Sequence, residues 1–151
     1  MTPLRWLADL RNWLLLRHYL RQGLKLGREV RIIGKPDFGS EPYLIEIGDH
    51  VMFANHCFVG DSDHRYDDPD LPVTWQGFVP RGPVRIGSNA WFGVNCVVTG
   101  GVEIGERCVI GANSVVTQDL PPGVIAAGVP AKVLREIEFK SVQTHGRLAD
   151  A

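Results

Sequence analysis

The sequence predicts a mainly β protein in which residues 26–133 form a parallel β-solenoid. Bulky apolar residues recur at every sixth position, and glycine directly follows most of them. A period of six differs from the helical period of about 3.6 and from the alternation of a long strand. It fits short strands separated by turns, each pointing one large and one small side chain inward. Three such segments would close one triangular coil.

The first element, residues 1–25, is predicted to be a basic helical extension. Thr2 and Pro3 are typical of a helix N-cap and first helical position. Up to Arg28 there are five arginines and one lysine against one aspartate. Two hypotheses follow: the helix packs across the open end of the solenoid, or it rests on an anionic membrane. The apolar residues that share one face of this helix are Trp6, Leu7, Leu10, Trp13 and Leu14.

The repeat starts weakly at Leu26, Ile32 and Phe38 and then becomes regular, giving about four further coils. The large positions are Ile47, Phe53, Val59, Ile86, Phe92, Val98, Ile104, Ile110 and Val116. The small positions, four residues later, are Val51, Cys57, Ala90, Cys96, Val102, Cys108 and Ser114. Glycine beside a large position would permit either a positive φ at a corner or a close approach of two backbones.

All three cysteines occupy small positions of the repeat. They are therefore interpreted as core residues rather than reactive thiols. Their odd number, without CxxC spacing, argues against a disulfide framework or structural zinc and favours a reducing cytoplasm.

The repeat is interrupted between Val59 and Ile86, where 26 residues stand in place of five. Residues 61–83 are therefore expected to leave the solenoid as a loop, and loops of this length are often functional. This one carries His64, five aspartates, Trp75 and Phe78. Its aspartates lack the regular spacing of a calcium site, which favours a solvated lid.

The repeat ends in the proline- and glycine-rich stretch 121–130. Residues 134–151 are predicted to hold a short C-terminal helix, starting near Ala131, and a polar tail.

Composition narrows the function classes. A formal net charge of -1 gives no overall attraction to nucleic acid. No apolar run reaches the roughly 20 residues of a membrane-spanning helix, so a protein neither secreted nor integral to a membrane is expected.

Three stretches carry a resemblance to a known family. They are IGDHVMFANHCFV, DSDHRYDD and the block from VRIGSNAWFGVNCVV to GVPAKVLREI. The last combines the repeat phase, Trp91 and the GVPAK ending, and it resembles the hexapeptide-repeat acetyltransferases of the galactoside, maltose, nodulation-factor and polysaccharide O-acetyltransferase branch. The resemblance implies a left-handed β-helix, a homotrimer, and acetyl-CoA bound in clefts between neighbouring subunits.

The resemblance also implies site residues. His64 stands where the family has its basic histidine, and an imidazole with a near-neutral pKa suits removal of a proton from an attacking hydroxyl. Asp61 or Asp63 could orient that imidazole. With the cysteines assigned to the core and no activated serine visible, a direct transfer in a ternary complex is expected. The positions matching the family's CoA groove are Trp91, Gly93, Val94, Ala112, Thr117, Lys132 and Arg135.

The acceptor stays open, because HRYDD replaces the HPxH-like motif of the galactoside branch. The favoured function is O-acetylation of a sugar or cell-surface glycan intermediate by a cytoplasmic enzyme, with peripheral contact to the inner face of the membrane. Alternatives are N-acetylation of an amino sugar or nucleotide sugar, and serine O-acetylation. A zinc-dependent carbonic anhydrase on the same solenoid is disfavoured, because the closely spaced second histidine pair of those enzymes is missing; no metal is expected.

Overall fold

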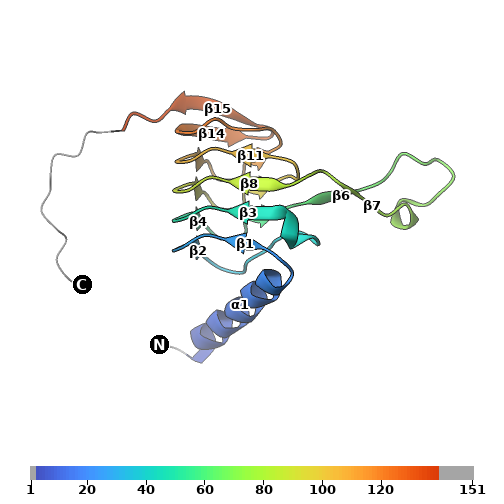
Figure 1. Ribbon diagram of the computed structural model, residues 1–151, viewed down its shortest axis with the longest axis horizontal. Coiled ribbons are helices and arrows are strands. Elements are labelled where there is room, and N and C mark those ends of the chain that lie inside the picture. The colour runs from blue at the N-terminus through green and yellow to red at the C-terminus, as the bar shows by residue number, and fades with distance from the viewer. Residues whose placement is uncertain (1–2, 140–151) are drawn as a thin grey trace, which may run out of the picture.

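The computed structural model describes residues 3–139 and is mainly β with one α-helix, which confirms the predicted class. Helix α1 (Pro3–Arg21) precedes three parallel sheets (Figure 1). Sheet A contains β1 (Lys25–Leu26), β3 (Ile45–Ile47), β8 (Val84–Ile86) and β11 (Glu103–Ile104). Sheet C contains β5 (Phe58–Val59), β10 (Val97–Val98) and β13 (Val115–Val116). Sheet B contains β2 (Arg31–Ile32), β4 (Met52–Phe53), β9 (Trp91–Phe92), β12 (Val109–Ile110), β14 (Val124–Gly128) and an antiparallel last strand, β15 (Ala131–Glu136).

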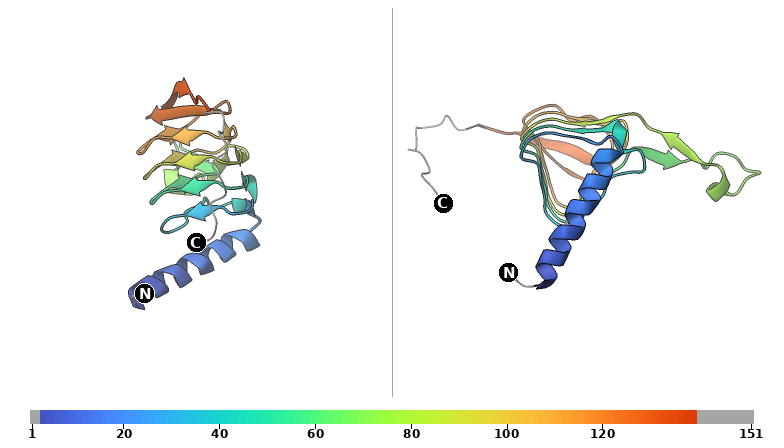
Figure 2. Two further views of the ribbon diagram at one scale, coloured as in Figure 1. Left: turned by 90° about the vertical axis from the view of Figure 1, so that its left-hand side faces the viewer. Right: turned by 60° about the horizontal axis from the view of Figure 1, so that its bottom comes forward.

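The chain visits sheets A, B and C in turn, so that the three sheets form the sides of a prism (Figure 2). Equivalent repeat positions pair across successive coils: Ile47 lies beside Ile86, and Ile86 beside Ile104. The weak first coil follows the same rule, since Leu26 pairs with Ile47 and Ile32 pairs with Phe53. A short 3-10 helix, η1 (Pro42–Leu44), precedes the second coil.

The predicted repeat positions form the core. The nine large side chains are at most 3 % exposed and the seven small ones at most 9 %. Phe53 and Phe92 stack inside the prism with ring centroids 4.6 Å apart. Burial of such apolar surface from every coil stabilises the stack, at about 25 cal/mol per Å².

The corners of the prism decide between the two roles open to glycine. Positive φ angles fall on non-glycine residues three places after the large position, such as His50 (58°), His56 (61°) and Asn95 (58°). The glycine instead allows close stacking: a Cβ on Gly87 would lie 2.5 Å from the backbone nitrogen of Glu106 in the next coil. The close-approach role is therefore the one observed.

The cysteines lie in the core as predicted. The neighbouring Cys57 thiol and burial raise the pKa of Cys96, and burial raises the pKa of Cys108. The same contact with Cys96 lowers the pKa of Cys57 to about 7. Cys57 Sγ nevertheless donates to the carbonyl of Gly93, 3.1 Å away, inside the prism.

Helix α1 lies across the N-terminal end of the prism (Figure 2). The side chains that pack there are Leu16 and Tyr19, with the Tyr19 ring edge-on to Phe38 at 5.2 Å. The apolar face identified in the sequence is not the one that packs, since among its described members Leu10, Trp13 and Leu14 are 38 %, 51 % and 54 % exposed.

The predicted C-terminal helix was also wrong. The chain reverses at Gly128–Pro130, and β15 pairs with β14, with Lys132 opposite Ala127. The last coil offers an unpaired strand edge, and pairing its N–H and C=O groups outweighs the helix propensity of this segment. The predicted polar tail lies outside the described residues.

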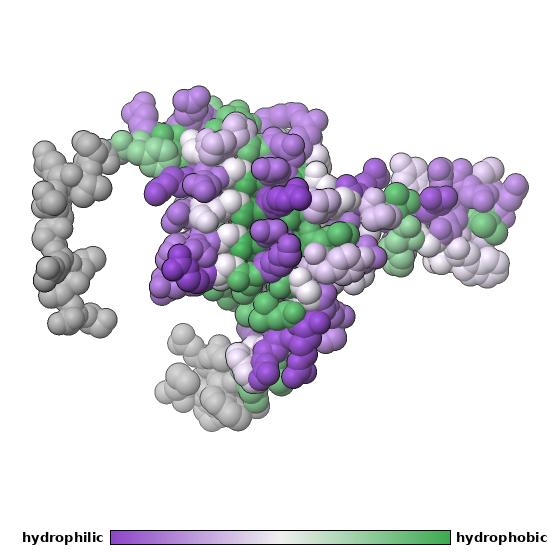
Figure 3. Space-filling model, viewed as in Figure 1, coloured by the Kyte–Doolittle hydropathy of each residue, from purple (hydrophilic) through white to green (hydrophobic). Residues whose placement is uncertain are grey.

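The extruded segment leaves the prism between β5 and β8, at the edge between sheets C and A, hereafter the C–A edge. Its stem is an antiparallel hairpin of β6 (Ser62–His64) and β7 (Phe78–Pro80), and its far part contains a 3-10 helix, η2 (Val73–Trp75). The hairpin projects sideways from the prism and carries a mixed hydrophilic and hydrophobic surface (Figures 1 and 3).

Candidate functional site

His64 lies on the stem of the hairpin, outside the prism. It is opposite Phe78 in the β6–β7 ladder, and the two ring centroids are 4.3 Å apart. The histidine is exposed, and among the described residues no hydrogen bond to its imidazole is formed. A hollow beside the ring is lined by Arg65, Tyr66 and Val79. The imidazole is therefore held by a ring contact while its nitrogens remain open to a ligand.

Asp61 has a structural task at the root of the hairpin. Its side chain is 2 % exposed, and its carboxylate accepts hydrogen bonds from the backbone N–H of Glu41 and, at 2.9 Å, from the hydroxyl of Ser62. The backbone carbonyl of Asp61 accepts from the N–H of Arg81 at 3.1 Å. Asp61 thus ties the hairpin to the turn before η1.

Asp63 is engaged elsewhere. Its carboxylate lies 2.6 Å from Nε of Arg81 on the other side of the hairpin root. In the part of the chain that the structure describes, neither Asp61 nor Asp63 forms a hydrogen bond with His64. The predicted orienting carboxylate is therefore not found in this single chain.

Trp91 lies on the outer face of sheet B and is 47 % exposed. In the strand register Trp91 pairs with Val109, Val109 with Ile125, and Ile125 with Arg135. Trp91 and Arg135 therefore share one row of the sheet, three strand spacings of about 4.8 Å apart. This arrangement brings an aromatic wall and a guanidinium to the same face, although they are distant in sequence.

Gly93, Val94 and Ala112 lie together at the edge between sheets B and C. A Cβ on Gly93 would meet the backbone nitrogen of Ala112 at 2.6 Å, and Val94 is 45 % exposed. Lys132, opposite Ala127, belongs to the same end of sheet B. Thr117 is separate: it follows β13 and lies at the C–A edge, from which the hairpin leaves.

The structure does not bring these groups into one site within a single chain. Sheet B forms the side of the prism opposite the C–A edge, so the row of Trp91 faces away from the hairpin of His64 (Figure 2). The predicted site residues thus fall into two groups on opposite sides of the prism, one on the hairpin and one on the outer face of sheet B, hereafter called the half-sites.

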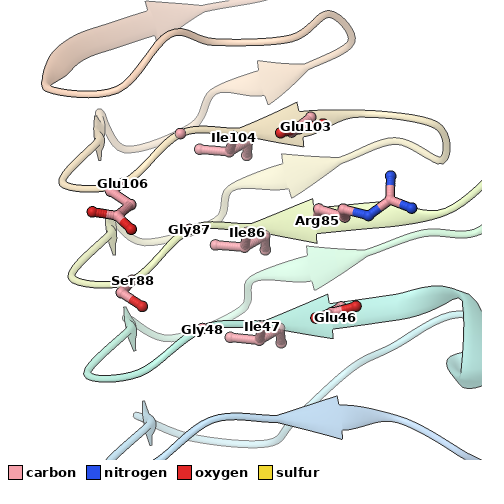
Figure 4. Close-up of a pocket in the computed structure, with 11 residues that line it drawn as sticks. Glu46, Ile47, Gly48, Arg85, Ile86, Gly87, Ser88, Glu103, Ile104 and Glu106 are labelled. Atoms are coloured by element: carbon pink, nitrogen blue, oxygen red, sulfur yellow. The ribbon is translucent and has the colours of Figure 1, made fainter.

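Sheet A carries a different kind of hollow. Along its outer face Lys25, Glu46, Arg85 and Glu103 pair in sequence, and Figure 4 shows the last three one above another, beside Ile47, Ile86 and Ile104. Lys25 Nζ lies 3.4 Å from Glu46 Oε2. The charges of this row alternate, so they neutralise one another and make this hollow a poor candidate for binding an anionic nucleotide.

His50 and His56 occupy corners of the prism. His50 Nδ1 lies 3.2 Å from a carboxylate oxygen of Glu29, beside the hollow next to Trp91. Within residues 3–139 of a single chain, no three His, Cys, Asp or Glu side chains are grouped so that they could hold a metal ion. No helix in the same range has the length and apolar content needed to span a bilayer.

Sequence reasoning missed Phe78, Arg81 and Glu41 as partners of the predicted residues. The hairpin that joins the first two to His64 and Asp63 has no alternating pattern, and its strands contain a proline and a histidine. Only one feature of the sequence could have indicated this hairpin. The interruption leaves the repeat and rejoins it at the same edge, and two strands of equal length that run out and back would achieve this.

Comparisons with known proteins agree with this fold. The family model described as "Hexapeptide repeat of succinyl-transferase" matches residues 83–118. Protein CapG of Staphylococcus aureus is 40 % identical over 123 residues, 77 % of this chain and 67 % of CapG. The probable acetyltransferase Rv3034c of Mycobacterium tuberculosis is 42 % identical over 112 residues, 74 % of this chain and 37 % of that protein.

Two solved structures are also similar. A maltose O-acetyltransferase from Clostridium difficile 630 is 30 % identical with a TM-score of 0.64, over 80 % of this chain and 73 % of that one. A galactoside acetyltransferase in complex with coenzyme A is 27 % identical with a TM-score of 0.52, over 80 % of this chain and 74 % of that one. The chain spans less than half the length of two curated relatives: 37 % of Rv3034c and 46 % of the galactoside O-acetyltransferase of Escherichia coli K12.

Proposed function

Because the chain belongs to the hexapeptide-repeat acetyltransferase family, we propose that it transfers an acetyl group from acetyl-CoA to a hydroxyl group of a sugar. The observation that carries the proposal is the presentation of His64 on a hairpin outside the prism, with its imidazole open to a ligand. A second support is that coenzyme A is bound by a similar galactoside acetyltransferase.

In the proposed reaction His64 takes the proton of the acceptor hydroxyl as its oxygen attacks the thioester carbonyl carbon. The C–S bond then breaks, and the CoA thiolate leaves and receives a proton from the imidazolium. A positioned base of this kind contributes about 10²–10⁴-fold to the rate. Backbone N–H groups at the coil corners are candidates to stabilise the oxyanion. The buried cysteines support direct transfer, without an acetylated thiol.

The groove for acetyl-CoA is proposed on the outer face of sheet B and its edge with sheet C. Trp91, Gly93, Val94 and Ala112 would form its wall, and Lys132 and Arg135 would meet the phosphates. Thr117 lies at the C–A edge, so its contact with CoA would come from a second copy of the chain. The separation of the two half-sites supports a homotrimer, with each site formed between neighbouring subunits. The prism is proposed to wind left-handed, as in the family.

The acceptor is proposed to be a sugar of a cell-surface glycan or its lipid-linked intermediate, modified in the cytoplasm at the inner face of the membrane. The proposal of a sugar rests on the names of the similar maltose and galactoside enzymes.

The test is an assay of CoA release from acetyl-CoA with a panel of acceptors: free sugars, nucleotide sugars, amino sugars and serine. Turnover is expected with a sugar hydroxyl, and His64→Ala should lower it about 10²–10⁴-fold with binding of CoA retained. The matched control is His18→Gln, since His18 is an exposed histidine on α1, which carries none of the predicted site residues.

Near-parental turnover of His64→Ala on the best acceptor would exclude this histidine as the base. Transfer to amines alone would replace O-acetylation by N-acetylation. A mass increase of one acetyl group on the enzyme during turnover would exclude direct transfer.

A further inference from the structure

Helix α1 carries apolar residues on two nearly opposite sides. Asn12, Leu16 and Tyr19 face the prism, and Asn12 donates a hydrogen bond of 2.9 Å to the carbonyl of Gly34. Each residue rotates about 100° around the helix axis, so Leu10, Leu14, Arg17 and Arg21 fall within about 60° of one another on the opposite side. This outer stripe consists of Leu10, Leu14, Arg17 and Arg21, with Trp13 on its flank.

The apolar members of the outer stripe, Leu10 and Leu14, are exposed and do not pack against the core of the prism. Leu14 and Trp13 are each about half exposed. Arg17 lies over the Trp13 ring, 4.7 Å from its centroid, so the aromatic surface and a positive charge are held together. In Figure 3 this end of the molecule shows strongly hydrophilic and hydrophobic residues next to each other.

Positive charge is concentrated at this end of the prism. Among residues 10–35 the only acidic one is Glu29, although the whole chain has a net charge of -1. Lys25 and Arg28 are paired with Glu46 and Asp49. Of the arginines of α1 whose side chains are described, Arg11, Arg17 and Arg21, none forms an ion pair with a described carboxylate. The basic residues of the range are Arg11, Arg17, Arg21, Lys25, Arg28, Arg31 and Lys35.

We propose that the outer stripe of α1 docks the protein on the surface of an anionic lipid bilayer. Leucine and tryptophan side chains between arginines fit the boundary between headgroups and acyl chains, where apolar and cationic groups are both stabilised. Nucleic acid would match the arginines but would leave Leu10 and Leu14 in water. A second copy of the chain would bring the same unpaired arginines against each other.

The docking would also set the orientation of the site, a consequence that rests on the proposed function. The hairpin leaves the prism from the second coil, and successive coils are about 4.8 Å apart. His64 would then lie a short distance above the headgroups, within reach of a sugar carried on a membrane lipid. In a cyclic trimer the three helices lie at one level along the rotation axis, so they can bind the same surface together.

The test is flotation of the full-length chain with vesicles of phosphatidylcholine alone and of phosphatidylcholine mixed with phosphatidylglycerol. Binding is expected only to the mixed vesicles and should weaken as salt is raised. Arg17→Gln with Arg21→Gln should weaken partitioning about 30-fold, since each cation near an anionic bilayer contributes about 5-fold. Leu10→Glu with Leu14→Glu should abolish it.

Matched controls are Arg85→Gln on sheet A and Trp75→Ala on the hairpin, both exposed residues away from α1, and both should float like the parent. Brominated lipid should quench tryptophan fluorescence of the bound protein, and the quenched fraction should fall in Trp13→Phe. His64→Ala should still float, so a failure of the proposed reaction would not be mistaken for a failure of docking.

Equal binding to neutral vesicles, no flotation, or retention of nucleic acid in place of vesicles would overturn the proposal. So would a smaller oligomer of the Leu10/Leu14 variant in solution, since a second copy would then cover the stripe.

Discussion

At the level of single residues, Asp61 is a buried carboxylate that holds the root of the hairpin. Asp61 stands three residues before His64. Its side chain is almost fully buried and accepts hydrogen bonds from the backbone N–H of Glu41 and the hydroxyl of Ser62. A buried donor that loses its acceptor costs about 1–3 kcal/mol. The carboxylate is thus better described as an anchor of the hairpin than as a partner of the imidazole.

Asp61→Ala is expected to lower the free energy of unfolding by about 1–3 kcal/mol and to reduce turnover about tenfold, because His64 would lose its fixed position. Asp61→Asn keeps an oxygen acceptor for the N–H of Glu41 and should recover most of both. The measurements are thermal melting and kcat as a function of pH. A residue that oriented the imidazole would shift the pH profile, whereas an anchor should lower kcat at every pH alike.

The residue scale also shows what a sequence can and cannot predict. The chemical identity of His64 and its place in the interruption were visible, because a lone histidine stood where the repeat failed. The hydrogen bonds of Asp61 and Asp63 could not be predicted. Their partners are Glu41 and Arg81, which the fold brings in from 20 and 18 residues away. Spacing along the chain gives no information on such contacts in a hairpin that has no alternating pattern.

At the level of elements, the glycines of the repeat set the distance between coils. Gly87→Ala would place a Cβ 2.5 Å from the nitrogen of Glu106 and 2.7 Å from the carbonyl carbon of Gly105, so adjacent coils would have to separate. Overpacking of this kind costs about 1–3 kcal/mol. The expected result is a melting temperature lower by about 3–10 °C.

Gly60→Ala is the matched control for that prediction. Its Cβ would meet the side chain of Phe58 at 3.1 Å, and this partly exposed ring can move. We expect less than about 1 kcal/mol of destabilisation. Equal melting temperatures for the two variants would show that coil spacing does not depend on the glycine.

The elements at the two ends were the ones that the sequence predicted least well. The repeat positions could be predicted because each coil has the same environment, so one pattern holds throughout. Helix α1 and β15 each occur only once, and each packs against surroundings that no other segment shares. The sequence of α1 has apolar residues on two sides, and only packing selects Leu16 and Tyr19 for the inner one. For β15, the unpaired edge of β14 outweighed local propensity.

At the level of the whole molecule, the prism separates the two half-sites. The hairpin leaves at the C–A edge, and the row from Trp91 to Arg135 lies on the opposite side. A rigid, fully buried core leaves no means to bring them together within one chain. Activity should therefore depend on assembly, with a hairpin from one copy facing sheet B of another.

Two inactive variants should consequently restore each other's activity. His64→Ala removes the proposed base, and Trp91→Glu places a negative charge in the proposed groove, where it would repel the phosphates of CoA. In mixed cyclic trimers made by co-expression from two tagged genes, about one site in three would combine an intact hairpin with an intact sheet B. CoA release by the doubly purified protein should then far exceed that of either variant alone.

Oligomers that combine His64→Ala with His64→Gln provide the control and should stay inactive. If the mixed His64→Ala and Trp91→Glu oligomers were as inactive as that control, the base and the groove would have to belong to the same chain, contrary to their separation across the prism.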